Sequence, residues 1–405
     1  MPDSAIRIRV RMTARPIDEP HRVASQLELL FDLTFVVAVA AVTAQFAHDI
    51  ADAHALDALL PFLQVFFAIW WAWMNFTWFA SSYDTDDVAY RLLTMLQMGG
   101  VLVLAAGVPA AAGHSDYRAV ALGYLIMRAG LVSQWIRAGV EDPERRRTAF
   151  RYAGGIAVLQ LGWVLWLLVP AALGLAVFLV LVVLELAVPR WAERSGATNW
   201  HPHHIAERYG LFTIILLGES VLAATTAVQR VVESAHVSAE LVTVAACGLI
   251  LLFSLWWLYF LHPAGHGLTE NRHRSYRWGY GHYALFGALA ALGAGLEVTV
   301  EQTGHHLPAS PTAVGYAVAI PIAAYFISLW TVHTAISTTP LGPLPTITAA
   351  ALVLLVPLTT PWTTPPITIA ALTTICVALT LITTMTRSNR RVACWTRVVP
   401  AGLGG

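Results

Sequence analysis

Residues 70–107 read WWAWMNFTWFASSYDTDDVAYRLLTMLQMGGVLVLAAG, and this stretch decides the fold of the chain. It contains two apolar segments that are too long for helices of an ordinary protein core, joined by a short acidic turn. A helix needs about 20 apolar residues to cross the hydrocarbon of a bilayer. The stretch is therefore typical of two membrane-spanning helices joined by a tight polar connection.

The composition of the whole chain agrees with this interpretation. Of its 405 residues, 57% are hydrophobic and only 12% are charged, which is about half the charged fraction of a soluble protein. The mean hydropathy is +0.63. The sequence lacks the alternation of apolar and polar residues that a membrane β-barrel shows. It predicts an all-α polytopic membrane protein whose first partner is the lipid bilayer.

Apolar runs of spanning length recur along the chain, and we count about twelve of them. All 24 basic residues are arginines, and they gather on alternate connections as the positive-inside rule requires, with Arg118 and Arg230 as exceptions. This pattern places both termini in the cytoplasm and the protein in the cell (plasma) membrane. The predicted spans are residues 26–47, 57–80, 92–112, 118–138, 150–169, 171–189, 205–227, 240–262, 278–302, 312–334, 345–360 and 365–387.

The pattern of residues 70–107 returns 186 residues later, which indicates an internal duplication. Trp70 and Trp71 correspond to Trp256 and Trp257 in this register. Six spans in each half is an even number, so we predict two parallel six-helix repeats. The predicted segments are a mobile cytoplasmic N-terminal tail (1–25), a first half (26–189), a cytoplasmic connection (190–204), a second half (205–387) and a cytoplasmic C-terminal tail (388–405), also mobile in its last dozen or so residues.

Charge, cysteines and motifs exclude several classes of function. The formal net charge is zero, so nothing suggests nucleic acid as a partner. The three cysteines, Cys247, Cys376 and Cys394, have neither metal-binding spacing nor the pattern of a disulfide framework. P-loop, dinucleotide and nucleophile-elbow motifs are absent from the sequence. We therefore predict no resident cofactor, except a magnesium ion if the protein is an enzyme. We expect a small molecule as the substrate.

Two ionisable residues of opposite sign lie near the middle of predicted spans. Arg128 lies about ten residues into its span and Glu219 about fourteen, which places each roughly 15–20 Å from a membrane face. Charges at this depth are costly and mark functional sites by default. Their opposite signs favour a pair, either as a structural bridge or as a substrate or proton-coupling site. Glu185 and Glu297 lie near predicted span ends, where we expect them to reach water.

A second candidate site opens the first predicted span. Glu28 and Asp32 are four residues apart and share one face of a helix. The two carboxylates are suited to binding a cation, holding a proton or meeting arginines from another helix. The alternative is an acidic helix N-terminus favoured by the macrodipole, which accounts for Glu28 better than for the deeper Asp32.

The acidic turn carries Asp84, Asp86 and Asp87, followed by Arg91. Three carboxylates are the oxygen ligands that Mg²⁺ prefers, and Mg²⁺ often bridges to phosphate. The turn is therefore a candidate magnesium site, with Arg91 as a candidate substrate contact. The alternative is that Asp84 caps a helix while the other two carboxylates are solvated.

The seventh predicted span begins with HHIAERYGLF, which contains His203, His204, Glu207 and Arg208. His203 and Glu207 share a helix face, and so do His204 and Arg208. The spacing resembles a metal pair only loosely and lacks the HExxH arrangement. A polar helix start at the membrane surface is the alternative. Glu207 and Arg208 join the candidate substrate or coupling residues.

Three blocks of sequence resemble the bacterial low temperature requirement A (LtrA) family: LELLFDLTFVVAVA, the stretch of residues 70–107, and HHIAERYGLFTIILLGES. The resemblance implies a polytopic membrane protein whose length and number of spans fit the entire chain. The family is named for growth in the cold, and the resemblance implies no biochemical activity. The blocks coincide with most of the candidate residues above, namely Glu28, Asp32, Asp84, Asp86, Asp87, Arg91, Glu207, Arg208 and Glu219.

The sequence is compatible with three functions. A secondary transporter of a small solute fits two six-helix halves with opposite charges near the midplane. A membrane-embedded enzyme fits the polar residues at the cytoplasmic face, where Mg²⁺ would hold an isoprenoid or lipid diphosphate for prenyl transfer or cyclisation. A non-catalytic scaffold linked to cold or stress tolerance is the third.

Overall fold

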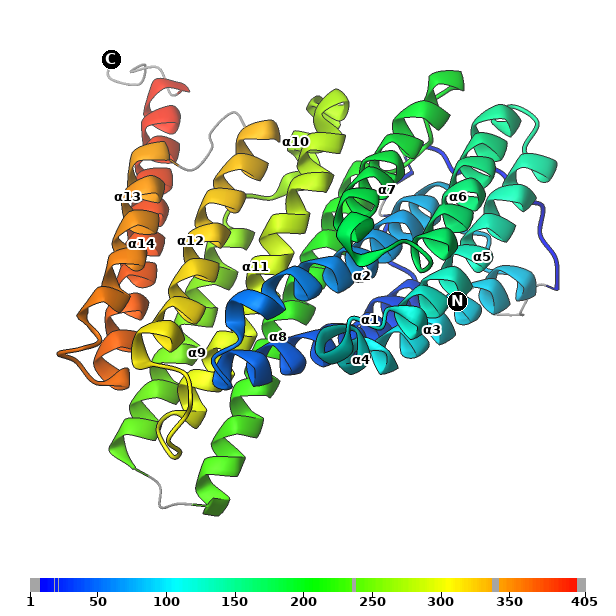
Figure 1. Ribbon diagram of the computed structural model, residues 1–405. Helices are drawn as coiled ribbons and strands as arrows, with labels where there is room; N and C mark the ends of the chain where they lie inside the picture. Colours follow the sequence, from blue (N-terminus) through cyan, green and yellow to red (C-terminus); the bar gives the residue numbers. More distant parts are fainter. Residues whose placement is uncertain (1–7, 18, 21, 235–237, 337–341, 399–405) are drawn as a thin grey trace, which may run out of the picture. The chain divides into compact units, whose positions relative to one another are not determined.

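The computed structural model describes residues 8–17, 19–20, 22–234, 238–336 and 342–398, with the backbone alone for residues 234 and 389–398. The described residues form α-helices and short 3₁₀ turns, and none of them forms a strand (Figure 1). The ends of both predicted tails, residues 1–7 and 399–405, lie outside the described residues.

Helices succeed one another with short connections along the whole described chain. In the first half they are α1 (Gln26–Ala51), α2 (Ala55–Tyr83), α3 (Val88–Ala106), α4 (Val108–His114), α5 (Arg118–Glu141), α6 (Arg146–Trp166), α7 (Ala171–Ala192) and the 3₁₀ turn η1 (Glu193–Ser195). The second half contains α8 (Pro202–Ser234), α9 (Ala239–Phe260), α10 (Ala264–Glu270), η2 (Arg272–Arg274), α11 (Ser275–Glu301), α12 (Pro311–Ile336), α13 (Pro343–Leu355), η3 (Val356–Thr359) and α14 (Pro365–Val398).

Ten helical segments of the described chain are long and apolar enough to cross a membrane. The chain is thus an all-helical, multi-pass membrane protein. Two of the predicted spans fall outside this set. The span predicted at 150–169 lies on α6, which opens with several arginines, and the span at 345–360 lies on the short apolar helix Pro343–Thr359. α14 also continues to Val398, beyond the predicted span end at residue 387.

The chain divides into two compact units. The first unit comprises Met1–Phe46 and Leu56–Ile215, and the second comprises Ala47–Ala55 and Leu216–Gly405. The division falls inside α8, whereas the sequence predicted a boundary in the polar connection at residues 190–204. A polar connection therefore does not mark the limit of either packed body.

Within the first unit, small residues allow α3 and α5 to cross closely. A Cβ atom added at Gly123 would lie 2.4 Å from the backbone nitrogen of Leu104. One added at Gly100 would lie 2.7 Å from the carbonyl oxygen of Gly123. Both distances are below van der Waals contact, so only glycine permits this approach, as is common where helices pack in membranes. α5 packs next on α6, and α6 on α7.

In the second unit, helices that follow one another in the chain also pack on one another. α11 packs on α12, α12 on α13, and α13 on α14. The closest crossing again involves a glycine, because a Cβ atom added at Gly295 of α11 would lie 2.3 Å from the carbonyl oxygen of Ala317 in α12. α14 also returns to α9, where Thr373 donates a hydrogen bond to the carbonyl oxygen of Cys247 at 3.0 Å.

The segment before α1 packs against the rest of the first unit, which corrects the prediction of a mobile tail for its described part. The amide of Val10 donates to Asp87 at 2.9 Å, and that of Met12 donates to Glu141 at 2.6 Å. The amide of Arg15 donates to the carbonyl oxygen of Ser82 at 2.9 Å. The Met12 side chain is fully buried. Backbone hydrogen bonds and a buried side chain hold this segment over the acidic turn.

Two adjacent glycines of α3 provide a matched test of the close crossing. Gly100→Ala should lower the free energy of unfolding by about 1–3 kcal/mol, because the added methyl group overpacks the crossing with α5. Gly99→Ala should leave it unchanged or raise it by up to about 1 kcal/mol, because the added Cβ would meet no atom within 4 Å beyond its chain neighbours and the adjoining helix backbone and alanine favours helix. Thermal unfolding in detergent measures both variants. Equal effects would contradict the assigned packing.

Candidate functional site

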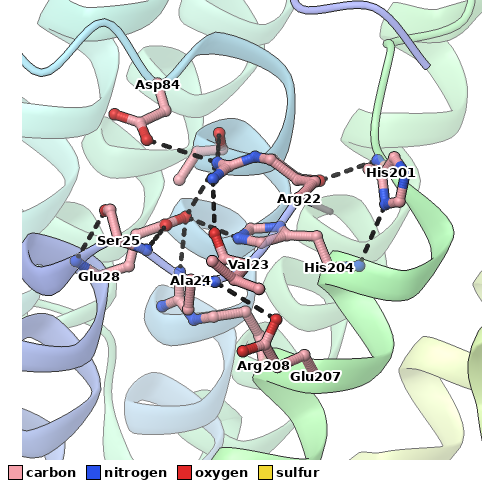
Figure 2. Close-up of polar contacts among 12 residues, drawn as sticks. Arg22, Val23, Ala24, Ser25, Glu28, Asp84, His201, His204, Glu207 and Arg208 are labelled. Atoms are coloured by element: carbon pink, nitrogen blue, oxygen red, sulfur yellow. Dashed lines mark hydrogen bonds and ion pairs between the residues drawn. The ribbon is translucent and has the colours of Figure 1, made fainter. Parts of the chain in front are cut away.

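Six ionisable side chains meet in the first unit, and we refer to them as the buried charge cluster. They come from the segment before α1, from α1 itself, from the turn between α2 and α3, and from the start of α8 (Figure 2). Each is exposed over less than a tenth of its side chain. The members are Arg22, Glu28, Asp32, Asp84, His204 and Arg208.

Glu28 is the centre of this cluster and also forms the start of α1. Its carboxylate accepts a hydrogen bond from the amide of Ser25 at 2.7 Å, while the Ser25 hydroxyl accepts from the amide of Glu28 at 3.4 Å. This reciprocal arrangement is a capping box. The same carboxylate lies 3.0 Å from Arg208 Nη1, 3.0 Å from His204 Nε2 and 3.6 Å from Arg22 Nη2. Glu28 therefore both caps the start of α1 and pairs with positively charged side chains, so both interpretations from the sequence apply to it.

Asp32 lies one turn further along α1 and binds the same arginine. Arg208 donates from Nε and Nη2 to the two carboxylate oxygens of Asp32, at 2.8 and 2.5 Å. Trp73 of α2 donates its indole N–H to Asp32 at 2.7 Å. A bidentate guanidinium–carboxylate pair with a further donor is the geometry in which two buried charges best compensate each other.

The start of α8 places its two polar faces in different surroundings. His204 and Arg208 are fully buried and face Glu28. His203 and Glu207 are exposed, and the Glu207 carboxylate accepts a hydrogen bond from the amide of Ala24 at 3.3 Å. Of the two candidate pairs, His204 with Arg208 is the interior one, and Glu207 lies at the rim.

Asp84 closes the cluster on the side of the acidic turn. It lies 3.5 Å from Arg22 and 3.5 Å from Arg15, while its Oδ1 atom is buried and accepts no hydrogen bond in the described structure. Burial, and then the negative charge of Glu28, raise the pKa of Asp84 to about 6. Asp84 is thus held by long contacts and only partly compensated.

The other two carboxylates of the turn face different arginines. Asp87 caps α3 by accepting from the amide of Tyr90 at 2.9 Å, and it also accepts from Arg137 Nη1 at 2.8 Å. Burial alone would raise the pKa of Asp87, but these bonds and that from the amide of Val10 outweigh it and lower the pKa to about 2. Asp86, half-exposed, pairs with Arg91 through bonds of 2.7 and 2.8 Å.

The proposed magnesium site is not visible as a ligand set in this turn. The three carboxylates diverge toward three arginine groups, and the described residues include no group of three or more His, Cys, Asp or Glu side chains placed to hold a metal ion. Arg91 lies beside Asp86 at the surface, outside the buried charge cluster. Magnesium binding here stays a prediction.

A second buried pair lies deeper in the first unit, and its partner differs from the one that the sequence suggested. Arg128 of α5 lies 3.5 Å from Glu185 of α7, and each is 1% exposed. Tyr124 accepts from Arg128 Nη2 at 2.5 Å and donates to Glu185 at 3.1 Å. Trp71 and Trp163 also donate to Glu185, at 2.8 and 3.1 Å. The prediction that Glu185 reaches water is wrong, because α7 continues past it for two more turns.

An aromatic groove lies near this pair, although neither Arg128 nor Glu185 forms part of its lining. Tyr124 and Trp163 form part of its wall and bond Glu185 on their other side. Gln64, Ala68 and Ala121 complete the lining with one valine. The remaining wall is aromatic and consists of Phe67, Tyr117, Trp166 and Phe178.

Glu219 belongs to the second unit, where it lies on α8 with 7% exposure. Its Oε2 atom is buried and accepts no hydrogen bond in the described structure. Glu297 of α11 is equally buried and pairs with Arg230, which also pairs with Glu301. Contrary to the prediction, Glu297 therefore does not extend freely to water, because Arg230 binds it.

The sequence matches the family described as bacterial low temperature requirement A protein (LtrA) over residues 23–382. The chain belongs to the LtrA family. An uncharacterized protein of Rhizobium meliloti (strain 1021), RA0937, is 28% identical over 289 residues, which cover 66% of this chain and 67% of that protein. No solved structure matches the chain. Within this LtrA protein, the family region contains every member of the buried charge cluster except Arg22.

Sequence reasoning missed several residues of these LtrA sites. Glu185 was taken for a span end because its apolar run was predicted to stop at residue 189, three residues before α7 ends. Tyr90, which is fully buried, corresponds to Tyr276 in the register of 186 residues, and the sequence gives no other signal for it. Arg22 and Arg137 were counted only as cytoplasmic charges, although each binds a carboxylate of the acidic turn.

Asp87→Asn tests the pairing in the acidic turn. The variant should lower the free energy of unfolding by about 2 kcal/mol at neutral pH, because asparagine still caps α3 but removes the charge that Arg137 binds. Since the pKa of Asp87 is lowered, the difference from wild type should persist down to about pH 4 and vanish as the pH falls toward the folded-state pKa. Thermal unfolding over this pH range measures it.

Asp86→Asn is the matched control, because Asp86 forms an exposed pair in the same turn. Exposed pairs contribute little to stability, and asparagine tolerates the positive φ of 48° at this position. A loss as large as that of Asp87→Asn would contradict the distinction between the two aspartates.

Proposed function

We propose that this LtrA protein is a secondary transporter of a small solute, with its substrate site at the Arg128–Glu185 pair and the adjoining aromatic groove. In this proposal α6 and the Pro343–Thr359 helix complete twelve crossings of the plasma membrane, and both termini are cytoplasmic. The observation that carries the proposal is a charged pair that is buried within spanning helices and whose Glu185 binds two wall residues of the aromatic groove, Tyr124 and Trp163.

The pair is a costly feature for a membrane protein to retain. Two ions in a low-dielectric interior contribute little net stability even when well paired, and intramembrane charges mark substrate or ion pathways by default. Nε and Nη1 of Arg128 are buried and have no hydrogen-bond partner in the described structure. These free donors are suited to an anionic group on a solute, while Glu185 compensates the guanidinium in its absence.

The groove is suited to the apolar part of such a solute. The polar hydrogens of its aromatic wall bind protein acceptors, as Tyr117 donates to Gln64 at 2.6 Å and Trp166 donates to the carbonyl oxygen of Gly174 at 2.8 Å. Trp163 donates to Glu185. The wall therefore presents ring faces and edges to an occupant, which favours apolar contact. We infer a substrate with an apolar group and an anionic group.

The packing order of the helices supports two repeats. α3 with α5, α5 with α6 and α6 with α7 correspond to α11 with α12, α12 with α13 and α13 with α14. Alternating access by rocking of two repeats is the mechanism that such an architecture serves. The matched tryptophans differ in their surroundings, since Trp70 and Trp71 are buried whereas Trp256 and Trp257 are about half exposed. The halves are thus specialised, and the charged pair belongs to the first.

Ligand-induced stabilisation tests the proposal with purified protein in detergent. A ligand that binds only the folded state must raise the unfolding midpoint. We expect small aromatic and aliphatic carboxylates to raise it in wild type, and Arg128→Ala to abolish the shift. The panel also contains matched amines, and Mg²⁺ with isoprenyl diphosphates. A shift that requires Mg²⁺ and diphosphate together, and that Asp86→Asn/Asp87→Asn removes, would replace the transporter with the membrane-enzyme alternative.

A substitution that fills the aromatic groove provides the second test of the proposed substrate site. Ala121→Phe should occupy the groove and abolish both the ligand shift and uptake of that ligand into proteoliposomes, without removing an existing contact. Leu122→Phe changes the next residue of α5, which is 51% exposed, and should leave both unchanged. Full uptake by Ala121→Phe would remove the groove from the transport pathway. Unchanged uptake in Glu219→Gln would restrict the pathway to residues other than Glu219.

A further inference from the structure

Four arginines of the first unit lie at one end of the helix pair formed by α6 and α7. Arg147 and Arg151 lie in the first two turns of α6, Arg190 lies in the last turn of α7, and Arg194 lies in η1. Arg151 is half-exposed and the other three are exposed. Within the described part of the chain, none of the four forms an ion pair with a carboxylate. Their positive charges are therefore not compensated by the protein.

The packing of α6 on α7 brings these arginines to the same level (Figure 1). Thr148 donates a hydrogen bond to the carbonyl oxygen of Gly196 at 3.0 Å, which joins the start of α6 to the turn after α7. The guanidinium group of Arg151 lies over the ring of Trp191, 5.7 Å from the ring centroid. Residues of both helices thus form one surface. We refer to it as the arginine surface, and its members are Arg147, Arg151, Arg190, Trp191 and Arg194.

The acidic residues at these helix ends are too few and bind other groups. Residues 144–155 and 186–196 contain six arginines and two glutamates. Glu144 pairs with Arg145, which is not a member of the arginine surface. Glu193 accepts hydrogen bonds from neighbouring hydroxyl groups. The arginine surface therefore keeps its positive charge and is suited to an anion.

The arginines at the start of α6 do not serve to stabilise that helix. The first turn of α6 contains Arg146 and Arg147 and no acidic residue, and no side chain caps the helix. The N-terminus of a helix favours negative charge, so cations at this position are unfavourable. An anion bound here would be favoured both by the guanidinium groups and by the helix terminus.

Away from the arginine surface, α6 and α7 present apolar side chains to their surroundings. α7 has 22 residues, which is about 33 Å and matches the hydrocarbon of a bilayer, about 30 Å. Its only charge before Arg190 is Glu185, which is buried in the protein. The arginine surface thus lies where lipid headgroups begin. The exposed apolar residues, spaced along one face of each helix, are Val158, Leu161 and Leu165 of α6 and Leu173, Val180 and Val183 of α7.

We propose that the arginine surface binds the headgroup of an anionic phospholipid, whose acyl chains lie along the exposed apolar faces of α6 and α7. Guanidinium groups match the oxygens of a phosphate through two-bond contacts. Trp191, which is 43% exposed, has the amphipathic ring that is enriched at headgroup level. The site rests on the membrane location of the chain and on this geometry, and it does not depend on the proposed transport function.

Charge favours a lipid over a second copy of the chain on this face. A symmetric dimer uses the same patch of both copies, so the arginines of one copy would lie close to those of the other. Like charges placed together oppose association. An anionic phospholipid compensates the arginines and covers the apolar faces at the same time.

Lipid binding to the purified full chain in a neutral detergent tests the site. Phosphatidylglycerol and phosphatidylcholine with the same acyl chains are titrated separately, and bound lipid is counted by native mass spectrometry. Wild type should prefer phosphatidylglycerol. Arg147→Gln/Arg151→Gln should weaken that binding by at least about tenfold, because one arginine beside an anionic lipid contributes about fivefold.

Arg118→Gln is the matched control, because Arg118 is also an exposed arginine at the start of a helix, α5. It should bind phosphatidylglycerol as wild type does. An equal loss in this control would indicate diffuse attraction to the whole protein and overturn the site. Equal affinity of wild type for the two lipids, or wild-type binding by Arg147→Gln/Arg151→Gln, would also overturn it.

Two tryptophans of equal exposure provide a second comparison that leaves every arginine in place. Trp191→Leu should weaken phosphatidylglycerol binding several-fold, because it removes the ring that Arg151 covers. Trp256→Leu replaces a ring of α9 that is 44% exposed and should leave the binding unchanged. Equal effects of the two substitutions would contradict a site at Trp191.

Two other occupants of the surface are distinguished by further measurements. Inorganic phosphate and glycerol 3-phosphate in excess should not displace the lipid, because they lack acyl chains. Complete displacement would assign the surface to a soluble anion and overturn a lipid site. Leu161→Cys in proteoliposomes that contain phosphatidylglycerol should form no cross-link between copies beyond those of wild type. A new cross-link would assign the apolar face to a second copy and equally overturn the proposal.

Discussion

The ion pair between Glu28 and Arg208 is the contact on which the polar interior of the first unit depends. It joins the first turn of α1 to the first turns of α8 over 3.0 Å, although the two residues are 180 positions apart in the sequence. Neither side chain reaches water, so neither charge is tolerated without the other. Asp32, His204, Arg22 and Asp84 are arranged around this pair, and the described part of the N-terminal segment covers the turn beside it.

The exclusive use of arginine is consistent with this constraint. Guanidinium is planar, stays charged and presents several donors in a fixed fork, so it binds a carboxylate through two bonds where lysine would offer one point charge. Arg208 with Asp32, Arg137 with Asp87 and Arg91 with Asp86 all form such two-bond contacts. Helices of low overall polarity are thereby connected through a small number of directional pairs.

The two buried sites of the first unit differ in how completely they are satisfied. Glu185 accepts from Tyr124, Trp71 and Trp163, whereas Nε and Nη1 of its partner Arg128 have no hydrogen-bond partner in the described structure. In the buried charge cluster the least satisfied group is instead Asp84, which is held by contacts of 3.5 Å and whose Oδ1 atom accepts no hydrogen bond. The unsatisfied donors of Arg128 are the feature on which the proposed substrate site rests.

The sequence alone determined the class of the protein, the approximate position of its helices and its family, because hydropathy and the spacing of arginines are properties of neighbouring residues. It also placed Glu28 with Asp32, and His204 with Arg208, on common helix faces, since i,i+4 neighbours share a face in any α-helix. Only the tertiary structure decided that these faces meet, that Arg128 binds Glu185, and that Asp84, Asp86 and Asp87 diverge to separate arginines. Such pairings depend on how distant helices rotate and cross, and close glycine crossings such as that of Gly100 with Gly123 determine this through packing that no local pattern records.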